Sequence, residues 1–245
     1  MNISTSVLTV EENGNEIETF YRIEAAKTDY FHIDVMDGEF VENNTADKMK
    51  RFADTLSNIT LTPIEVHLMC KNVKSFVDEY SPINPNTLIF HIEVCENENR
   101  VMEYINYIKE KGIKVGIALN PETSPAEVEP YLKYIHEVLV MTVHPGYGGQ
   151  AFINETVDKI SDLRRFIDEN DLDTEINCDG GINSETIVKV KDAGAETAVV
   201  GSAMINAIDY KYMMNKLKNT YKEEVGWSEP LKCTPVSRHR KKNLC

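Results

Sequence analysis

The stretch FHIDVMDG, residues 31–38, places His32, Asp34 and Asp37 in what otherwise has the composition of a buried β-strand. A buried strand normally lacks ionised groups, because an uncompensated charge loses its hydration there. Side chains two residues apart point to the same face of a strand, so His32 and Asp34 share a face, with Met36 next on it. The stretch therefore predicts a buried strand whose polar face meets a compensating group near its end.

Short apolar runs of the same kind recur along the chain, and most are followed by a polar stretch with helical spacing. The runs lie at residues 4–10, 30–36, 63–69, 87–94, 113–119, 137–143, 174–179 and 197–201. Eight strands alternating with helices, at about 28 residues per unit, are typical of parallel βαβ units. Many runs are apolar on both faces, as in strands between a packed interior and outer helices. The pattern predicts a (β/α)8 TIM barrel, an α/β fold in a single domain.

The polar stretch at residues 97–112 illustrates the helical spacing. It carries Val101, Ile105 and Ile108 at i, i+4 and i+7, and Gly112 is expected to end the helix. A doubly wound open sheet is the alternative arrangement of βαβ units. It is disfavoured because the first βα turn has no GxGxxG motif.

The charge is unevenly distributed along the chain. We expect a barrel domain at residues 1–222 and a flexible C-terminal tail at residues 223–245. The chain has a net charge of −14, and residues 221–245 hold six Lys or Arg and three Asp or Glu, so the rest has a net charge of −17. An acidic body of this kind repels nucleic acid and anionic membranes. An anionic small substrate must then be held locally, by backbone N–H groups or by a metal.

The sequence also indicates the compartment. It contains no run of about 18 apolar residues, so we expect no membrane span. Residues 1–16 lack a basic segment followed by an apolar one, so we expect no secretory signal. The cysteines are odd in number and include no CxxC pair: Cys70, Cys95, Cys178, Cys233 and Cys245. We therefore expect reduced thiols in a cytoplasmic protein.

Polar groups stand at the ends of three predicted strands. Besides His32 and Asp34, His67 lies near the end of the run at 63–69, and Asp179 ends the run at 174–179. The carboxyl ends of barrel strands converge on one mouth, where barrel chemistry occurs. Two imidazoles and two carboxylates suit one divalent ion such as Zn, Fe(II), Co or Mn rather than Ca or Mg. Taken singly, each histidine could instead be a core residue and each aspartate part of a turn, and we assign Asp37 with Gly38 to a turn.

Glycine-rich segments follow three later strands: HPGYGGQAF at 144–152, DGGI at 179–182 and GSAM at 201–204. Glycine lets backbone N–H groups approach an anion closely, and the loops after strands seven and eight form the usual phosphate site of a barrel. The first segment is long and glycine-hinged, which suits a loop that closes over a substrate. Plain turn chemistry is the alternative for any one of these segments taken alone.

Several motifs together carry a family resemblance. FHIDVMDGEFVENNT, EVHLM, HIEV, VGIALNPET, VMTVHPGYGGQAFI, CDGGI and AGAETAVVGSAM resemble, in order across residues 3–205, the ribulose-phosphate 3-epimerases. The resemblance implies a TIM barrel with one divalent metal that epimerises D-ribulose 5-phosphate to D-xylulose 5-phosphate at C3, in the pentose phosphate pathway. It implies two-base proton transfer through a 2,3-enediolate. It also implies a sugar phosphate as the partner and a homo-oligomer, either a dimer or a hexamer.

The resemblance also assigns roles to individual residues. It implies the metal ligands His32, Asp34, His67 and Asp179, with Asp34 and Asp179 as the acid/base pair. It implies substrate contacts from Ser6, His67, Met36, Met69, Met141, Gly146, Tyr147, Gly148, Gly149, Gly180, Gly181, Gly201 and Ser202. The methionines beside the reacting carbons would, without the resemblance, be assigned to core filling.

The chain departs from the family pattern at a few positions. Glu42 stands where the family usually has Pro, His144 stands where it has Asn or Asp, and residues 45–56 replace a start of the second helix that usually contains Gly-Pro. None of these changes removes a ligand or a catalytic acid, but they bear on the sugar that is recognised. TDYFHIDVMDG, KVGIALNPET and VMTV also resemble the allulose-6-phosphate 3-epimerases, which act on a hexulose phosphate.

Two remoter functions are disfavoured by particular residues. Decarboxylation of orotidine 5′-phosphate on a related barrel uses an Asp-x-Lys-x-x-Asp array, whereas Met36 occupies the lysine position after Asp34. A non-catalytic sugar-phosphate binding protein would not need both acids and all four ligands, which this chain retains. The sequence therefore favours a metal-dependent isomerase.

Overall fold

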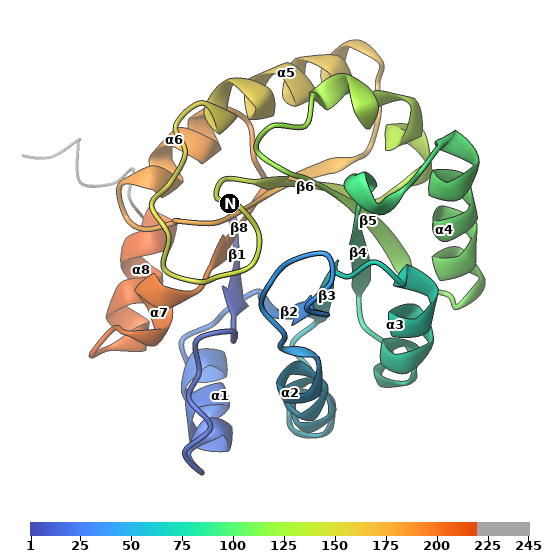
Figure 1. The fold of residues 1–245 in the computed structure, drawn as a ribbon. Coiled ribbons are helices and arrows are strands. Elements are labelled where there is room, and N and C mark those ends of the chain that lie inside the picture. Colours follow the sequence, from blue (N-terminus) through green and yellow to red (C-terminus); the bar gives the residue numbers. More distant parts are fainter. Residues whose placement is uncertain (220–245) are drawn as a thin grey trace, which may run out of the picture.

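Eight parallel strands pair in chain order and close on themselves, β8 pairing with β1 (Figure 1). The computed structural model describes residues 1–219, and the tail expected at 223–245 lies outside them. The predicted TIM barrel is confirmed. The strands are β1 Asn2–Ser6, β2 Tyr30–Met36, β3 Ile64–Met69, β4 Thr87–His91, β5 Lys114–Leu119, β6 Glu137–Met141, β7 Glu175–Asp179 and β8 Thr197–Val200.

The helices surround the barrel on its outside (Figure 1). They are α1 Glu16–Ala25, α2 Ala46–Ile59, α3 Val73–Tyr80, α4 Glu98–Glu110, α5 Thr156–Glu169, α6 Thr186–Asp192, α7 Ser202–Ile205 and α8 Tyr210–Asn219. The predicted apolar face of α4 is buried at Val101, Ile105 and Ile108. None of the helices within residues 1–219 has the length and hydropathy that crossing a bilayer requires.

The fifth unit has no α-helix between β5 and β6. Two short 3-10 helices, η3 Pro125–Glu127 and η4 Glu129–Tyr134, take its place. Pro125 and Pro130 stand in the first turns of these helices, where the missing N–H of proline is tolerated. Tyr131 and Leu132 are nevertheless buried, so η4 still covers the barrel.

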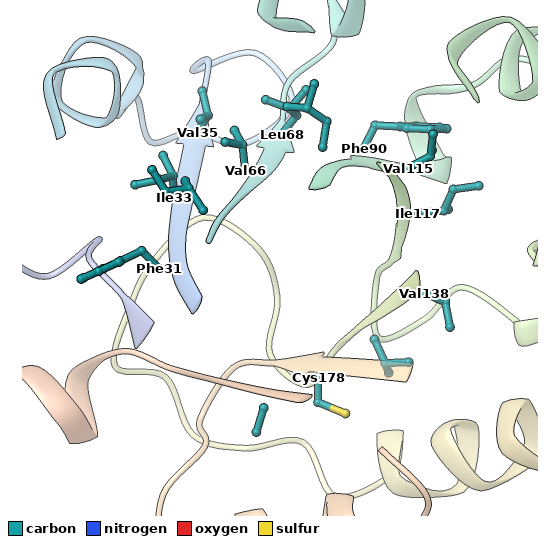
Figure 2. Packing of buried hydrophobic residues seen from close by; sticks show 14 of the residues in the cluster. Phe31, Ile33, Val35, Val66, Leu68, Phe90, Val115, Ile117, Val138 and Cys178 are labelled. Atoms are coloured by element: carbon teal, nitrogen blue, oxygen red, sulfur yellow. The ribbon is translucent and has the colours of Figure 1, made fainter. Parts of the chain in front are cut away.

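The two faces of β2 have opposite chemistry. Phe31, Ile33 and Val35 lie on the side of the strand that faces away from the barrel interior (Figure 2). They are completely buried, and such side chains each stabilise a fold by about 1.5–3 kcal/mol. The intervening residues His32 and Asp34 must then point into the barrel. The apolar packing of the outer layer therefore sets the direction of the polar groups.

The barrel interior is apolar on one side only. One compact cluster of buried residues belongs to β4, β5, β8 and the region of β6, and consists of Ile89, Ala118, Leu139, Met141, Val143 and Val199. The interior faces of β2 and β3 instead carry His32, Asp34, Glu65 and His67, all buried. Most of the buried polar groups of the interior therefore lie beside β2 and β3, with Glu137 on β6 as a further buried carboxyl group.

Glu137 is a buried carboxyl group that the sequence analysis did not single out. It lies on β6 with 1% of its surface exposed, and its Oε1 atom has no hydrogen-bond partner. Burial, followed by the nearby charge of Glu65, raises the pKa of Glu137 well above its usual value. Glu65 is held by hydrogen bonds from Ser4 Oγ and His32. We therefore expect Glu137 to stay protonated at pH values where an exposed glutamate is ionised.

Raising the pH from 5 to 8 should lower the free energy of unfolding less in the variant Glu137→Gln than in the wild type. The pKa of Glu137 is higher in the folded than in the unfolded state. The free energy of unfolding is therefore highest below the unfolded pKa of about 4.3, and it decreases as pH rises toward the folded pKa. Glutamine does not titrate, so the difference should reach on the order of 1 kcal/mol or more. Urea unfolding at both pH values measures it, with the exposed Glu18→Gln as the control. Parallel pH dependence in the wild type and Glu137→Gln would contradict the assignment.

Candidate active site

Four ligand-type side chains converge inside the mouth of the barrel. Asp34 and His67 are direct register neighbours on β2 and β3, His32 lies one pleat below Asp34, and Asp179 ends β7. His67 Nδ1 lies 3.2 Å from Asp34 Oδ1 and 3.7 Å from Asp179 Oδ2. His32 Nε2 lies 3.4 Å from Asp34 Oδ1. One ligand atom from each of the four residues lies within 4.8 Å of the others.

The arrangement fits a divalent metal ion. His32 Nε2 is completely buried and has no hydrogen-bond partner, which is costly unless another group uses its lone pair. Ligand atoms placed at 2.0–2.2 Å around a tetrahedral ion would be about 3.3–3.6 Å apart, close to the measured separations. The nitrogen and carboxylate donors match those of Zn, Fe(II), Co or Mn sites. The described residues can therefore hold such an ion.

The two aspartates have different electrostatic surroundings. Burial would raise the pKa of Asp34, but the nearby charge of His32 and the hydrogen bond and charge of His67 lower it far below its usual value. Burial and the neighbouring charge of Asp34 raise the pKa of Asp179 to about 7. Burial lowers the pKa of His67 to about 4, although its hydrogen bond with Asp34 opposes the shift. Without a metal, the site therefore contains one anionic carboxylate and one carboxyl group that titrates near neutral pH.

The second oxygen of Asp34 points to a different partner. Ser6 Oγ donates a 2.6 Å hydrogen bond to Asp34 Oδ2, and Ser6 is the register neighbour of His32. Thr45 Oγ1 donates a 2.7 Å hydrogen bond to the carbonyl of Asp34. These bonds fix both the backbone and the carboxylate plane, so Oδ1 faces the ligand cluster while Oδ2 stays on the side of Ser6.

Asp37 makes the predicted turn after β2. Its Oδ1 accepts hydrogen bonds of 2.8 Å from the backbone N–H groups of Glu39 and Phe40, and its Oδ2 accepts one of 2.7 Å from Lys71 N–H. Gly38 has φ +76°, a conformation that favours glycine. Asp37 therefore joins the loops after β2 and β3 and takes no place among the ligands.

A pocket opens above the four ligands. Most of the predicted site residues line it: Ser6, Asp34, Met36, Met69, Met141, Gly146, Tyr147, Gly148, Gly149, Asp179, Gly180, Gly181, Gly201 and Ser202. His32 and His67 are not among the lining residues, because both are completely buried beneath them. The expected contact of His67 with substrate stays a prediction. His144, named above as a departure from the family pattern, also lines the pocket, and so do residues that the sequence did not single out, namely Leu8, Thr9, Val143, Pro145, Gln150, Ile182 and Val199.

The segment at 144–152 crosses from β6 toward the loops after β1 and β2. Asn43 Nδ2 donates a hydrogen bond of 3.0 Å to the carbonyl of Gly146, and a Cβ atom at Gly148 would lie 2.9 Å from Thr9 Cγ2. Gln150 Nε2 donates to the carbonyls of both His144 and Tyr147, which gives the segment an internal brace. The segment therefore forms one wall of the pocket.

The turn after β7 is sterically restricted to glycine. Gly180 has φ +122°, and a Cβ atom there would lie 2.3 Å from the Val143 side chain. Gly181 has φ +65°, and a Cβ atom there would lie 2.7 Å from the backbone nitrogen of Phe152. Both glycines bring the backbone close to the segment at 144–152, so their role in packing is clear from the structure alone.

Buried residues next to the ligands were also missed. Glu65 Oε2 lies 3.3 Å from His32 Nδ1, and His91 Nε2 lies 2.8 Å from His67 Nε2. The signal was present, because Glu65 alternates with His67 along β3 and His91 ends β4. The departures from the family pattern do not involve these buried residues. One of them, His144, is exposed, and its Nδ1 atom lies 3.3 Å from Glu122 Oε1.

The chain is similar to several known proteins. The model of the Ribulose-phosphate 3 epimerase family matches residues 2–205. Ribulose-phosphate 3-epimerase from Methanocaldococcus jannaschii is 39% identical over 91% of this chain and 92% of that protein. The enzyme of the same name from Escherichia coli is 36% identical over 80% of this chain and 85% of that protein. The solved structure of a 3-hexulose-6-phosphate synthase superposes with a TM-score of 0.66 and 12% identity, covering 90% of this chain and 99% of that one, which shows the fold alone.

Proposed function

The chain belongs to the ribulose-phosphate 3-epimerase family, and on this premise we propose that it interconverts D-ribulose 5-phosphate and D-xylulose 5-phosphate. The observation that carries the proposal is the pair Asp34 and Asp179, which come from separate strands and both line the pocket above the ligand cluster. Inversion at C3 needs one proton-transferring group on each face of the substrate, and this pair supplies two.

The proposed reaction removes the C3 proton, which is acidified by the adjacent C2 carbonyl. A carboxylate on one face takes that proton to leave a 2,3-enediolate, and the carboxyl group on the other face returns a proton. Pairs of carboxyls whose surroundings separate their pKa values are suited to act as base and acid. Asp34, held by Ser6, and Asp179, with its pKa raised to about 7, form such a pair in the metal-free site.

The proposed cofactor is one divalent ion, Zn, Fe(II), Co or Mn, held by His32, Asp34, His67 and Asp179. When bound, it supplies Lewis-acid stabilisation of the negative charge that develops on the substrate oxygens. Its charge would also explain why ionised side chains are buried in the barrel. We further propose, from the family resemblance, a cytoplasmic homo-oligomer, a dimer or a hexamer.

Epimerisation of allulose 6-phosphate is the alternative, favoured by the motifs shared with that sister family. His144, which departs from the family pattern, lines the pocket and bears on the choice of sugar. A substrate panel that compares kcat/KM for ribulose 5-phosphate and allulose 6-phosphate tests the choice. We expect the five-carbon substrate to be preferred. A higher kcat/KM for the six-carbon substrate would assign the chain to the alternative.

We expect the substrate phosphate to bind backbone N–H groups of Gly181, Gly201 and Ser202, without a dedicated arginine. No Lys or Arg occurs among the described residues that line the pocket. Backbone N–H groups in glycine-rich turns after strands seven and eight are the usual phosphate site of this fold. A crystal structure with substrate or phosphate measures the contacts. An anion held by two or more Lys or Arg side chains elsewhere would contradict the prediction.

A further inference from the structure

β4 contributes no proposed ligand, yet its last residue touches one. His91 is completely buried, and its ring meets that of His67 edge to edge, with centroids 5.0 Å apart and an interplanar angle of 23°. His91 Nε2 lies 2.8 Å from His67 Nε2, and His91 Nδ1 lies 3.1 Å from Glu93 Oε2. The three side chains form one continuous row from the ligand cluster to the loop after β4.

The protons in this row can be placed by elimination. A carboxylate only accepts hydrogen bonds, so the bond to Glu93 requires a proton on His91 Nδ1. A neutral His91 then has a lone pair at Nε2, which must accept the bond from His67 Nε2–H. A neutral His67 protonated at Nε2 has its lone pair at Nδ1, 3.2 Å from Asp34 Oδ1. Two acceptors face each other favourably only with a cation between them, so this placement of protons is that of the proposed metal-bound site. The metal ligand is therefore left in its binding tautomer.

The far end of the row is fixed by the loop after β5. Glu93 Oε1 accepts a 2.7 Å hydrogen bond from the backbone N–H of Asn120 and another from Thr123 Oγ1. Phe40 packs beside the middle of the row, its ring centroid 4.8 Å from that of His91. The carboxylate of Glu93 is therefore held with one oxygen on Asn120 and Thr123 and the other on His91.

We propose that Glu93 and His91 are positioning residues that hold His67 in the Nε2–H tautomer and so direct its Nδ1 lone pair to the metal. The inference rests on the proposed metal site. His32 has the same kind of support in a shorter form, because Glu65 Oε2 lies directly at its Nδ1 atom. Partners of this kind set the tautomer and orientation of ligand histidines and commonly change metal affinity by about 10–100-fold.

The isosteric variant Glu93→Gln tests the direction in which the hydrogen bonds of this row run, from donor to acceptor. Asn120 N–H and Thr123 O–H both need an acceptor, so the glutamine carbonyl should face them and its NH2 should face His91. His91 would then accept at Nδ1 and donate from Nε2, which moves the His67 proton onto Nδ1. We expect Zn²⁺ affinity to fall by about 10–100-fold in chelator competition on the full-length loaded protein. Ring-nitrogen NMR of the metal-free protein should show the reversed His67 tautomer.

Control variants distinguish an effect on the tautomer of His67 from a general effect on packing. Glu96→Gln changes an exposed glutamate of the same loop and should bind zinc like the wild type. His91→Phe keeps an aromatic ring but removes the hydrogen bonds to His67 and Glu93. If Glu93 acts through His91, adding Glu93→Gln to this variant should cause no further loss of zinc affinity. Wild-type zinc affinity and an unchanged His67 tautomer in Glu93→Gln, or additive losses in the double variant, would overturn the inference. Failure of the wild type to bind zinc, or retention of zinc by His67→Ala, would overturn the proposed metal site as well.

Discussion

Replacing either Asp34 or Asp179 with asparagine should stop epimerisation, with kcat lower by at least about 10³-fold. General acid–base catalysis alone contributes about 10²–10⁴-fold, and each residue is also a proposed metal ligand. Asparagine keeps the shape of the side chain but neither takes up nor returns the C3 proton. Steady-state kinetics with ribulose 5-phosphate measures the loss after the metal content of each variant has been matched to the wild type.

The two variants should differ in a half-reaction. A variant that keeps the base for one epimer can still exchange the C3 proton of that epimer with deuterated water, without inverting it. The partner variant should exchange the opposite epimer. Mass spectrometry of recovered substrate measures both exchanges. Near wild-type epimerisation by either metal-loaded variant would refute the two-base mechanism and require a single mobile base or a solvent relay.

The variant His67→Ala should lose bound metal and activity together. His67 is completely buried, and its Nδ1 atom lies between Asp34 Oδ1 and Asp179 Oδ2, 3.2 Å and 3.7 Å away. Removing one of four ligands should weaken binding by more than about 100-fold, because loss of an outer partner alone costs about 10–100-fold. Metal analysis of the purified protein, together with chelator competition, measures the effect.

A matched variant controls for the loss of a histidine. His136 precedes β6, lies beside Lys114 Nζ at 3.1 Å and is not part of the ligand cluster, so His136→Ala should keep its metal. Added Zn²⁺, Co²⁺ or Mn²⁺ should not restore His67→Ala at concentrations that saturate the wild type. Stoichiometric metal in purified His67→Ala would show that His67 is not a ligand.

The predicted bounds agree with the structure for β2 but not for β1. β2 begins and ends where it was predicted, at residues 30–36, because its two faces meet different surroundings along its whole length. The first run was predicted at 4–10, but β1 ends at Ser6. Val7 and Val10 are still buried, and Val10 N–H bonds to the carbonyl of Val7, so the apolar run continues into a turn that packs on the core. Hydrophobic periodicity indicates burial better than it indicates the end of a strand.

The sequence by itself determined the barrel, the four ligand-type residues and the turn at Asp37, because strand alternation and the convergence of strand ends are local or fold-wide rules. Only the tertiary structure decided what stands behind the ligands. Glu65 reaches His32 through the register of β2 with β3, and His91 reaches His67 through that of β3 with β4. The loop after β5 then supplies the donors that fix Glu93. A hydrogen bond needs atoms within about 3 Å, and which residues of separate strands come that close depends on register and closure of the whole barrel rather than on any single segment.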